Sequence, residues 1–520
     1  MTITPIKNFQ GWLSLVNPRN VEDNQFEELT NMFYNDDKRI QSRRWVDFFW
    51  NELPNGKPVT SLFFFQNDET AERILLATGG TQMYKYNEGT EDYDEIKTWL
   101  TEFEADWVTR TRWSFAVYRN EVYMCNWIDN YQKLVSPYGS GNFTEHAGQP
   151  KCRYLEYMQD SIYGGWDDSN PSTLYYTDAA AANANAINAN VIVVWGDELW
   201  RINWIKELWQ IILVWKNKKI YSINVAAQSA LPIDSQNWLY SHRATERVWG
   251  SLWYFNDTWF DFLKQRQGVT GSQWLDSESK TWDLSVLTNK ITPNSYNYSY
   301  SEYIGALKNL YWTFDTSDNK VPDTTLVWST LVWAWSKYIL PNTNDSAQYI
   351  DSDWVVHYLL ASWTEGRVYE IEKWFDDFGA GIPVSLTTKE WDLWDITRFD
   401  TFEYMDIVWL KNEGWEVNIE VLVGWEVVGY SILDDSYLNV NSSALTIGTR
   451  PTGVYPIWGG LWDDTVDMYS YKIRVPLMDT DTTIQLKMSS EHVGLVWTLD
   501  KIAIASEKES DDMFEMSFIW

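Results

Sequence analysis

The sequence is poor in cysteine and in positive charge. Cys125 and Cys152 are too few for a disulfide framework and lack the spacing of metal ligands. We interpret them as buried thiols, with a single disulfide as the alternative. The 41 Lys and Arg residues stand against 73 Asp and Glu, which gives a formal net charge of −32. Because binding to a phosphate backbone depends on clustered cations, we expect no sequence-specific nucleic-acid binding.

Long apolar runs and a leader pattern are also missing. The longest apolar stretches, such as residues 209–215, have the length of a strand and fall short of the ~20 residues that a membrane helix needs. The first ten residues lack a basic segment followed by an apolar one, which a secretory signal would have. We therefore expect no membrane span and assembly in a cytoplasm.

Patterns that carry chemistry are scarce. The four histidines are isolated, and none stands in an H-E-x-x-H frame, so we interpret them as core or solvated side chains. They are His146, His242, His357 and His492. The acidic runs 463–467 and 479–481 lack the ligand spacing of a calcium loop and indicate solvated turns. The sequence thus predicts no catalytic, cofactor-binding or metal-ligating residue, no cofactor, and a protein that is not an enzyme.

Tryptophan is what the chain has in excess. It contains 35 Trp and only 26 Gly, although glycine alone averages about 7 % of ordinary sequences. At Gly424-Trp425, two β-rich runs flank a two-residue connection, and such hairpin turns need positive φ, which favours glycine. Similar settings recur at Trp12, Trp166, Trp195, Trp354 and Trp458.

These positions lead to a hypothesis about decoding. The gene would come from a source in which UGA encodes glycine, and it would be translated here with a code in which UGA encodes tryptophan. Most of the 35 tryptophans would then be glycine in the native protein. Trp113, Trp253 and Trp335 lie in or beside aromatic strand segments and are interpreted as genuine. The alternative is a tryptophan surface that stacks on sugars or bases, but such residues would gather on one face instead of at turns along the chain.

Strand-like runs separated by turn residues recur from residue 59 to residue 382. When one strand position is taken as an anchor in each repeated unit, the anchors are spaced by roughly 40–57 residues, close to the ~40–50 of four-stranded propeller blades. The anchors lie near residues 75, 115, 162, 212, 253, 310 and 358. The pattern predicts an all-β fold with a β-propeller of about six to eight blades. An irregular array of β-sandwiches is the alternative.

Two local structures are predicted within this repeat. Arg119-Asn120 joins two short apolar runs in the manner of a tight hairpin. The alanine-rich stretch 178–186 contains repeated Asn, which favours a surface loop over a helix.

The segments outside the repeat have different sequence patterns. Residues 1–58 are predicted to form an N-terminal arm, in which 21–32 could form one short helix through the spacing of Phe26 and Leu29. Residues 383–506 show longer alternating strands, which predict a C-terminal antiparallel β-sandwich. Residues 507–520 are predicted to be a charged tail.

Several segments carry a resemblance once the suspect tryptophans are read as glycine. They are FQG-G-LSLVNPRNVEDNQFEELTNM and RIQSRR-G near the start, NPSTLYYTD, ELWQIILVWKNKKIYSI and VYEIEKW in the repeat, and TTKEWDLWD with FDTFEYMDIVWL near the sandwich. In this order they resemble segments of propeller-containing structural proteins of tailed bacteriophages. Each motif is degenerate, so the specificity lies in their order, and the likeness covers most of the chain.

The resemblance implies a non-enzymatic virion component of the tail or the neck-to-tail region, similar to ring-forming tail nozzle proteins. The implied partners are other virion proteins and further copies of the chain, in a homo-oligomeric ring that forms or lines a channel for genome passage. An anionic wall would repel DNA and let it slide. A propeller-type glycan-binding or glycan-cleaving protein is the alternative, since propellers host many functions. A cellular β-repeat scaffold is a third possibility.

Overall fold

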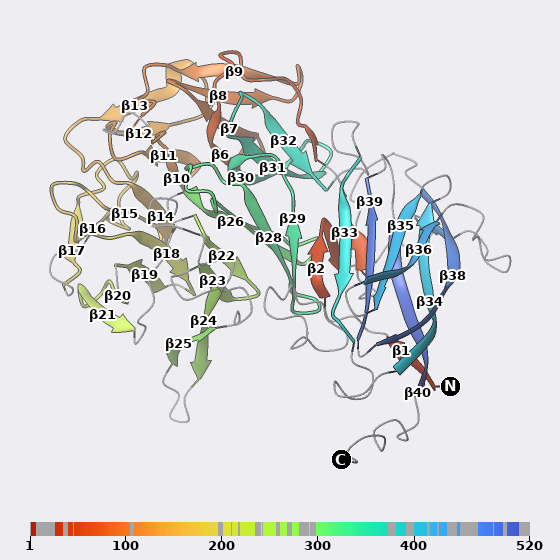
Figure 1. Ribbon diagram of the computed structural model, residues 1–520. Helices are drawn as coiled ribbons and strands as arrows, with labels where there is room; N and C mark the ends of the chain where they lie inside the picture. The colour runs from red at the N-terminus through yellow and green to blue at the C-terminus, as the bar shows by residue number, and fades with distance from the viewer. Residues whose placement is uncertain are drawn as a thin grey trace.

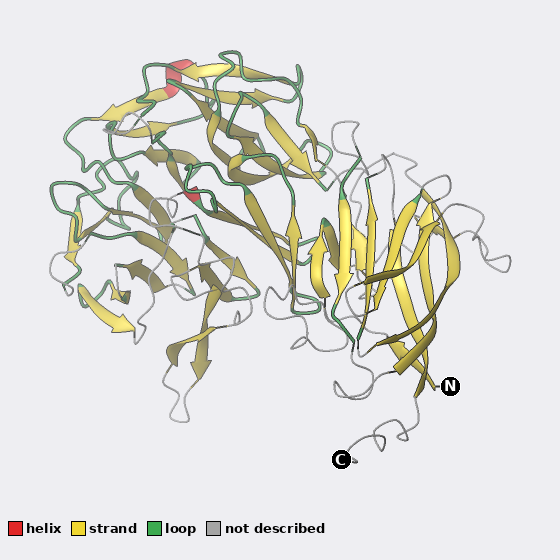
Figure 2. Ribbon diagram, in the orientation of Figure 1, coloured by secondary structure: helices red, strands yellow, loops and turns green. Residues whose placement is uncertain are grey.

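The structure is a computed structural model of the 520-residue chain (Figure 1). Strands account for almost all of its regular structure, and helical residues are few, as in the 3₁₀ turn Ser140–Asn142 (Figure 2). Within the described ranges, no helix has the length and apolar character needed to cross a membrane. The predicted all-β class is confirmed. The structure describes residues 2–6, 26–34, 40–44, 46–103, 109–195, 201–209, 211–216, 219–233, 241, 243–255, 260–267, 273–279, 291, 298–372, 381–391, 400–412, 416–423, 426–433, 445–447, 466–481, 483–491 and 497–508.

Six four-stranded antiparallel sheets are the blades of a β-propeller. Their first strands lie side by side around the ring, as the contacts of β10 with β14, β14 with β18 and β30 with β6 show. The blades are β6–β9 (Val59–Gln66, Arg73–Gly79, Gln82–Asn87, Asp92–Lys97), β10–β13 (Ser114–Tyr118, Glu121–Cys125, Tyr131–Leu134, Phe143–His146), β14–β17 (Tyr154–Met158, Ser161–Gly165, Thr173–Tyr176, Asn190–Val193), β18–β21 (Trp204–Leu208, Ile211–Trp215, Ile220–Asn224, Ser229–Ile233), β22–β25 (Thr245–Val248, Ser251–Phe255, Phe260–Gln267, Gln273–Ser279) and β30–β32 with β5 (Thr343–Ile350, Val356–Ser362, Val368–Ile371, Val46–Phe48).

One further meander has the same strand order. It consists of β26 (Tyr300–Ile304), β27 (Asn309–Phe314), β28 (Thr324–Ser329) and β29 (Ala334–Tyr338). Its first strand contacts β22 on one side and β30 on the other, and β29 continues through β2 into a larger sheet. The seven predicted anchors fall one each in β7, β10, β15, β19, β23, β27 and β31. The predicted repeat is therefore confirmed.

An N-terminal strand completes the last blade. β5 pairs with β32 through Val46↔Ile371, Asp47↔Glu370 and Phe48↔Tyr369. Because β5 precedes the first blade and β32 follows the others, this pairing closes the ring by hydrogen bonds between its two ends. The predicted hairpin at Arg119-Asn120 is present as well, since β10 and β11 pair up to Tyr118↔Glu121 and both turn residues have positive φ.

Two large sheets stand beside the ring (Figure 1). The seven-stranded sheet has the order β3-β4-β40-β34-β38-β37, with β1 also paired to β40, and the nine-stranded sheet has the order β26-β27-β28-β29-β2-β33-β39-β35-β36. Their buried side chains share one cluster, which includes Leu386, Ile419, Ile407 and Ile504. The strands not yet given are β1 (Thr2–Ile6), β2 (Phe26–Thr30), β3 (Met32–Tyr34), β4 (Ile40–Ser42), β33 (Val384–Thr388), β34 (Asp400–Asn412), β35 (Val417–Val423), β36 (Glu426–Leu433), β37 (Leu445–Ile447), β38 (Val466–Asp481), β39 (Ile484–Ser490) and β40 (Trp497–Lys508).

The predicted helix at 21–32 is wrong where the structure describes it. Residues 26–30 form β2, which pairs with β33, and the register shifts between Phe26 and Glu28. A bulge of this kind adds one residue to the strand, so that Phe26 and Leu29 both face the core although they are three residues apart. That spacing imitates a helical period. The stretch 178–186 forms turns and bends, as predicted for a loop.

Asn31 ties the ring to the large sheets. It is fully buried and has a left-handed φ of 55°. Its side-chain amide donates to the Pro383 carbonyl (2.7 Å), and its Oδ1 accepts from the Ile339 backbone N–H (2.7 Å) and from Arg43 Nε (2.9 Å). Ile339 follows β29 and Pro383 precedes β33, so one side chain satisfies backbone groups of both parts.

Among the residues that the structure describes, eight tryptophans have a left-handed backbone, with φ between 47° and 65°. They are Trp50, Trp99, Trp127, Trp166, Trp209, Trp249, Trp333 and Trp354. A left-handed conformation costs a non-glycine residue roughly 1–2 kcal/mol. Of the positions singled out from the sequence, Trp166 and Trp354 belong to this group, Trp195 does not, and Trp12, Trp425 and Trp458 lie outside the described residues. Trp113, Trp253 and Trp335 are buried and lack a positive φ.

Trp99→Gly should therefore stabilise the protein. Trp99 is 93 % exposed with φ 63°, so its removal relieves backbone strain and takes little from the core. We expect the free energy of unfolding in urea to rise by about 1 kcal/mol. Trp113→Gly is the matched control, because this buried indole should cost about 3–5 kcal/mol. A Trp99→Gly protein less stable than its parent would contradict the strain argument.

Candidate functional site

The middle of the propeller holds a buried ion pair built on Arg243. This residue stands two positions before β22. Its Nη1 lies 2.6 Å from Asp345 Oδ2 on β30, and its Nη2 donates to the Trp113 carbonyl (2.9 Å) and to Ser61 Oγ of β6 (3.3 Å). Trp113 directly precedes β10. One guanidinium therefore connects four separate blades across the centre of the ring.

The partners of Arg243 are themselves fixed by the backbone. Asp345 Oδ2 also accepts from the Leu62 N–H (2.8 Å), and Ser61 Oγ accepts from the Trp113 N–H (2.9 Å). The Arg243 and Asp345 side chains are only 12 % and 11 % exposed. Several hydrogen bonds hold this pair, so removal of either member would strongly destabilise the folded state. We call Arg243, Asp345, Ser61 and Trp113 the Arg243 hub.

A second guanidinium lies near the hub. Arg112 Nη2 donates to Asn344 Oδ1 (3.3 Å), and Asn344 Nδ2 donates to the Val59 carbonyl (2.8 Å). Burial, followed by the positive charge of Arg243, lowers the pKa of Arg112 to about 10, while Asp345 opposes the shift. Two guanidinium groups thus lie close to the single carboxylate of Asp345.

Charged side chains from the middles of four first strands form what we call the carboxylate belt. Its members are Glu156 on β14, Lys206 on β18, Glu246 on β22 and Glu302 on β26. Lys206 Nζ lies 3.9 Å from Glu156 Oε2. Glu302 accepts hydrogen bonds from Ser346 Oγ (2.9 Å) and Gln348 Nε2 (2.8 Å) of β30. These groups lie deep in the ring, yet each keeps some exposed surface.

The belt favours a proton on Glu302. Burial, followed by the negative charge of Glu246, raises the pKa of Glu302 to about 8, while the hydrogen bonds from Gln348 and Ser346 act against the shift. Burial also raises the pKa of Glu246 and of Glu156, whereas the charge of Glu156 raises the pKa of Lys206. Glu302 can therefore hold a proton near neutral pH.

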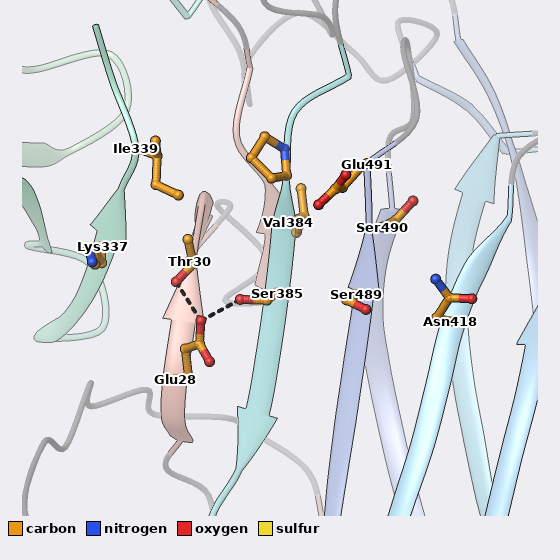
Figure 3. Close-up of a pocket in the computed structure, with 11 residues that line it drawn as sticks. Glu28, Thr30, Lys337, Ile339, Val384, Ser385, Asn418, Ser489, Ser490 and Glu491 are labelled. Atoms are coloured by element: carbon orange, nitrogen blue, oxygen red, sulfur yellow. Dashed lines mark hydrogen bonds between the residues drawn. The ribbon is translucent and has the colours of Figure 1, made fainter. Parts of the chain in front are cut away.

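A separate hollow of about 420 Å³ lies on the nine-stranded sheet, over strands that include β29, β2 and β33 (Figure 3). Glu28 of β2 lines it, and its Oε1 accepts from Ser385 Oγ (2.6 Å) and Thr30 Oγ1 (3.1 Å). Ser489, Asn418 and Lys337 add hydroxyl, amide and charged groups to the lining, and Ile339, Pro383 and Val384 add apolar ones. This hollow offers hydrogen bonds to a small polar molecule.

The residues singled out from the sequence lie apart from these sites. His357 is buried between Glu370 (Nδ1–Oε1 2.6 Å) and Asp351 (Nε2–Oδ2 3.1 Å). Burial alone would lower its pKa, but the hydrogen bonds and charges of the two carboxylates outweigh it and raise the pKa. Burial lowers the pKa of His146. His242 and His492 lie outside the described residues.

The predicted buried thiols are present, since Cys125 and Cys152 are both free and fully buried. Across the described ranges, no three His, Cys, Asp or Glu side chains are grouped so as to hold a metal ion. Of the acidic runs, residues 463–465 lie outside those ranges, and the side chains of 466–467 and 479–481 are not described.

Sequence reasoning missed the hub and the belt. The hub joins residues 61, 113, 243 and 345, which no local pattern connects. A signal for the belt existed, because Glu156, Lys206 and Glu302 are each the third residue of the first strand in their unit. Repeat alignment at that position would have placed them together.

No protein-family model and no curated protein matches the chain. Among solved structures it is similar to YCF48 bound to D1 peptide (TM-score 0.38, 11 % identity, covering 64 % of this chain and 97 % of that one). It is also similar to the extracellular domain of BT4673 from B. thetaiotaomicron (TM-score 0.41, 9 % identity, 81 % and 59 %) and to the designed protein Ika8 (TM-score 0.35, 11 % identity, 63 % and 100 %). At these values the likenesses carry no argument about function.

Removing the guanidinium from the hub should be strongly destabilising. Arg243→Met leaves Asp345 charged and buried, so the free energy of unfolding should fall by about 3–5 kcal/mol. Arg247→Met is the control, because its pair with Glu207 has a similar distance of 2.9 Å but the arginine is 46 % exposed. That variant should lose less than about 1 kcal/mol in the same urea titration. Equal losses would contradict a structural role of the hub.

Glu302→Gln should change how stability depends on pH. In the unfolded chain Glu302 titrates near its ordinary 4.5, and in the fold near 8, so the native state binds the extra proton between these values. The contribution of Glu302 to the stability of the parent therefore falls as pH rises through this range. The variant should match the parent at pH 4.5 and exceed it by about 1 kcal/mol or more at pH 9. Glu69→Gln is the control, because Glu69 is exposed. If the difference in stability between Glu302→Gln and the parent did not depend on pH, the raised pKa of Glu302 would be refuted.

Proposed function

We propose that the protein is a non-enzymatic structural component of a tailed-bacteriophage virion, in the tail or the neck-to-tail region. It would assemble in the host cytoplasm into a homo-oligomeric ring that forms or lines a channel for genome passage, together with other virion proteins. The resemblance of its ordered sequence motifs is the source of this proposal. The β-propeller joined to two large sheets supports it, as an architecture of the implied kind.

The Arg243 hub is the observation that carries the structural role. Its polar groups are used on one another across the centre of the ring, which favours a rigid scaffold over an open catalytic cleft. Because the hub crosses the middle of the propeller, a genome would pass between copies of the chain and not through one propeller. The net charge of −32 would keep such a passage repulsive to DNA.

Two finer statements about the fold belong to the same proposal. The meander β26–β29 would be a seventh blade, since β26 contacts the first strands on both sides. The two large sheets would form a β-sandwich, since their buried side chains share one cluster.

The decoding hypothesis is part of the proposal too. A virus whose host reads UGA as glycine would encode glycine at most of the tryptophan positions. The eight tryptophans in the left-handed region support this, because glycine adopts such a backbone without a Cβ clash.

The alternative function, glycan binding, has one feature in its favour. The hollow at Glu28 is lined by hydroxyl and amide groups of the kind that bind sugar hydroxyls. Its polar groups lie on the large sheet and away from the centre of the propeller.

Imaging of the correctly decoded protein tests the main proposal. The gene would be expressed with UGA translated as glycine, and the product examined by negative-stain microscopy and mass photometry, alone and with the proteins encoded beside it. We expect closed rings, and peptide mass spectrometry of native particles should find glycine at position 354. A strictly monomeric particle under all these conditions would count decisively against the ring.

A further inference from the structure

His357 has a carboxylate oxygen at each of its two ring nitrogens. Nδ1 lies 2.6 Å from Glu370 Oε1, and Nε2 lies 3.1 Å from Asp351 Oδ2. Asp351 Oδ1 accepts from the backbone N–H groups of Val355 (2.7 Å) and Asp353 (3.0 Å), which keeps Oδ2 directed at the ring. A neutral imidazole has one N–H and one lone pair, so it can donate to only one carboxylate. The geometry therefore calls for one additional proton, and the short 2.6 Å contact places it between His357 and Glu370.

Little water reaches this proton. The side chains of His357 and Glu370 are only 9 % and 7 % exposed. The rings of Phe49 and Tyr349 pack against the imidazole, with centroids 5.4 Å and 5.7 Å away. Because solvent screens such a buried group poorly, the charge of the imidazole matters to the groups around it.

The site adjoins the strand that closes the propeller. Glu370 lies opposite Asp47 of β5 in the pair of β32 with β5. Residues directly opposite each other in an antiparallel pair share a face, and two like charges there repel each other. Phe49, which follows β5, donates its backbone N–H to the Val368 carbonyl (2.8 Å) while its ring packs against the imidazole. The additional proton thus supplies positive charge where the two ends of the propeller are joined.

We propose that the protonated pair of His357 and Glu370, which we call the His357 latch, holds β5 on β32 and releases it when the proton is lost. Without the proton, a ring nitrogen presents its lone pair to a carboxylate oxygen, and buried Glu370 faces Asp47 without the charge of the imidazolium. β5 is the element that gives way, because only three residue pairs hold it, whereas β32 is also paired with β31. The latch acts within one chain and does not depend on assembly with further copies.

Titratable groups of several neighbouring elements surround the latch. They are Tyr349 on β30, Asp351 after it, Glu370 on β32, Asp47 on β5, Tyr86 on β8 and Glu88 after β8. Burial raises the pKa of Tyr86 and the pKa of Tyr349, so both phenols stay neutral while the latch loses its proton.

The pKa of His357 sets the direction of the pH dependence. Burial acts to lower this pKa, but the hydrogen bonds and charges of Glu370 and Asp351 outweigh burial and raise it. The folded chain therefore binds the proton more tightly than the unfolded chain does. The latch stabilises the fold fully below the ordinary value of about 6.5, and this stabilisation is lost as the pH rises through the raised value.

The first test is His357→Gln in the full chain, because glutamine cannot carry the proton. Urea titrations should show the parent more stable than the variant at about pH 6, and the difference should shrink towards about pH 9. Glu302 titrates in the same range, but it is present in both proteins, so its contribution cancels in the difference. His146→Gln is the matched control. Burial lowers the pKa of His146, so there the difference should grow as the pH rises.

Hydrogen exchange in the parent tests where the protein opens. Protection of residues 46–49 and 368–371, relative to the intrinsic rate at each pH, should fall by about fivefold or more between about pH 6 and about pH 9. Residues 114–125 of the second blade should keep their protection. Asp351→Asn should start the loss at lower pH, because its amide N–H would donate to Nε2 and favour a lone pair there.

Each outcome decides for or against the latch. Protection lost first at β5 and β32, and at lower pH in Asp351→Asn, supports it. A stability difference between the parent and His357→Gln that does not change with pH overturns it, as does exchange that rises equally in every blade. The exchange measurement needs only the parent, so it decides the matter even where a variant does not fold.

Discussion

The buried guanidinium of Arg243 is the constraint on which the ring depends. Neighbouring blades share hydrophobic clusters, as Tyr154, Trp204 and Tyr254 do, but contacts between neighbours do not fix the distance of a blade from the opposite side of the ring. Arg243 supplies that distance, because its charge must be satisfied where little water reaches and its partners come from β6, from β30 and from the residue before β10. These contacts connect blades on different sides of the propeller to one another.

The N-terminal segment joins the parts that the hub leaves separate. β5 completes the last blade, and Asn31 bonds to backbone groups beside β29 and β33. A stretch that looks aperiodic in the sequence is thus shared between the ring and the large sheets. The boundary at residue 58 remains a prediction, since these pairings link both sides of it.

Much of the fold could be predicted from the sequence, because it follows from local periodicity. The second strand of each blade is nearly all buried, so apolar runs such as that around Ile212 mark the repeat. In β35, outside the repeat, buried residues alternate strictly with more exposed ones, and this alternation predicted a strand there. The prediction of a helix at 21–32 is wrong because a bulge at Phe26 changes which residues of the strand face the core.

The candidate site could not be found in this way. Glu302 looks like any outward residue of an alternating strand until the ring brings Glu246 beside it. Arg243 looks like a loop residue, since its partners are separated from it by about a hundred residues or more in the chain. Chemistry that arises from closure of a ring has no signature in any one segment.

The closing strand also sets an order of events during synthesis. β5 leaves the ribosome early, but its partner β32 begins 320 residues after Phe48, at Val368. At about 5–20 residues per second, the chain needs roughly 16–64 s to make that partner. Until then the ring is an open arc in which blades can form one after another while both ends stay unpaired. A cell that makes this protein at high level would therefore carry many arcs at once, each with a β5 that could pair with the completed β32 of a neighbour in place of its own.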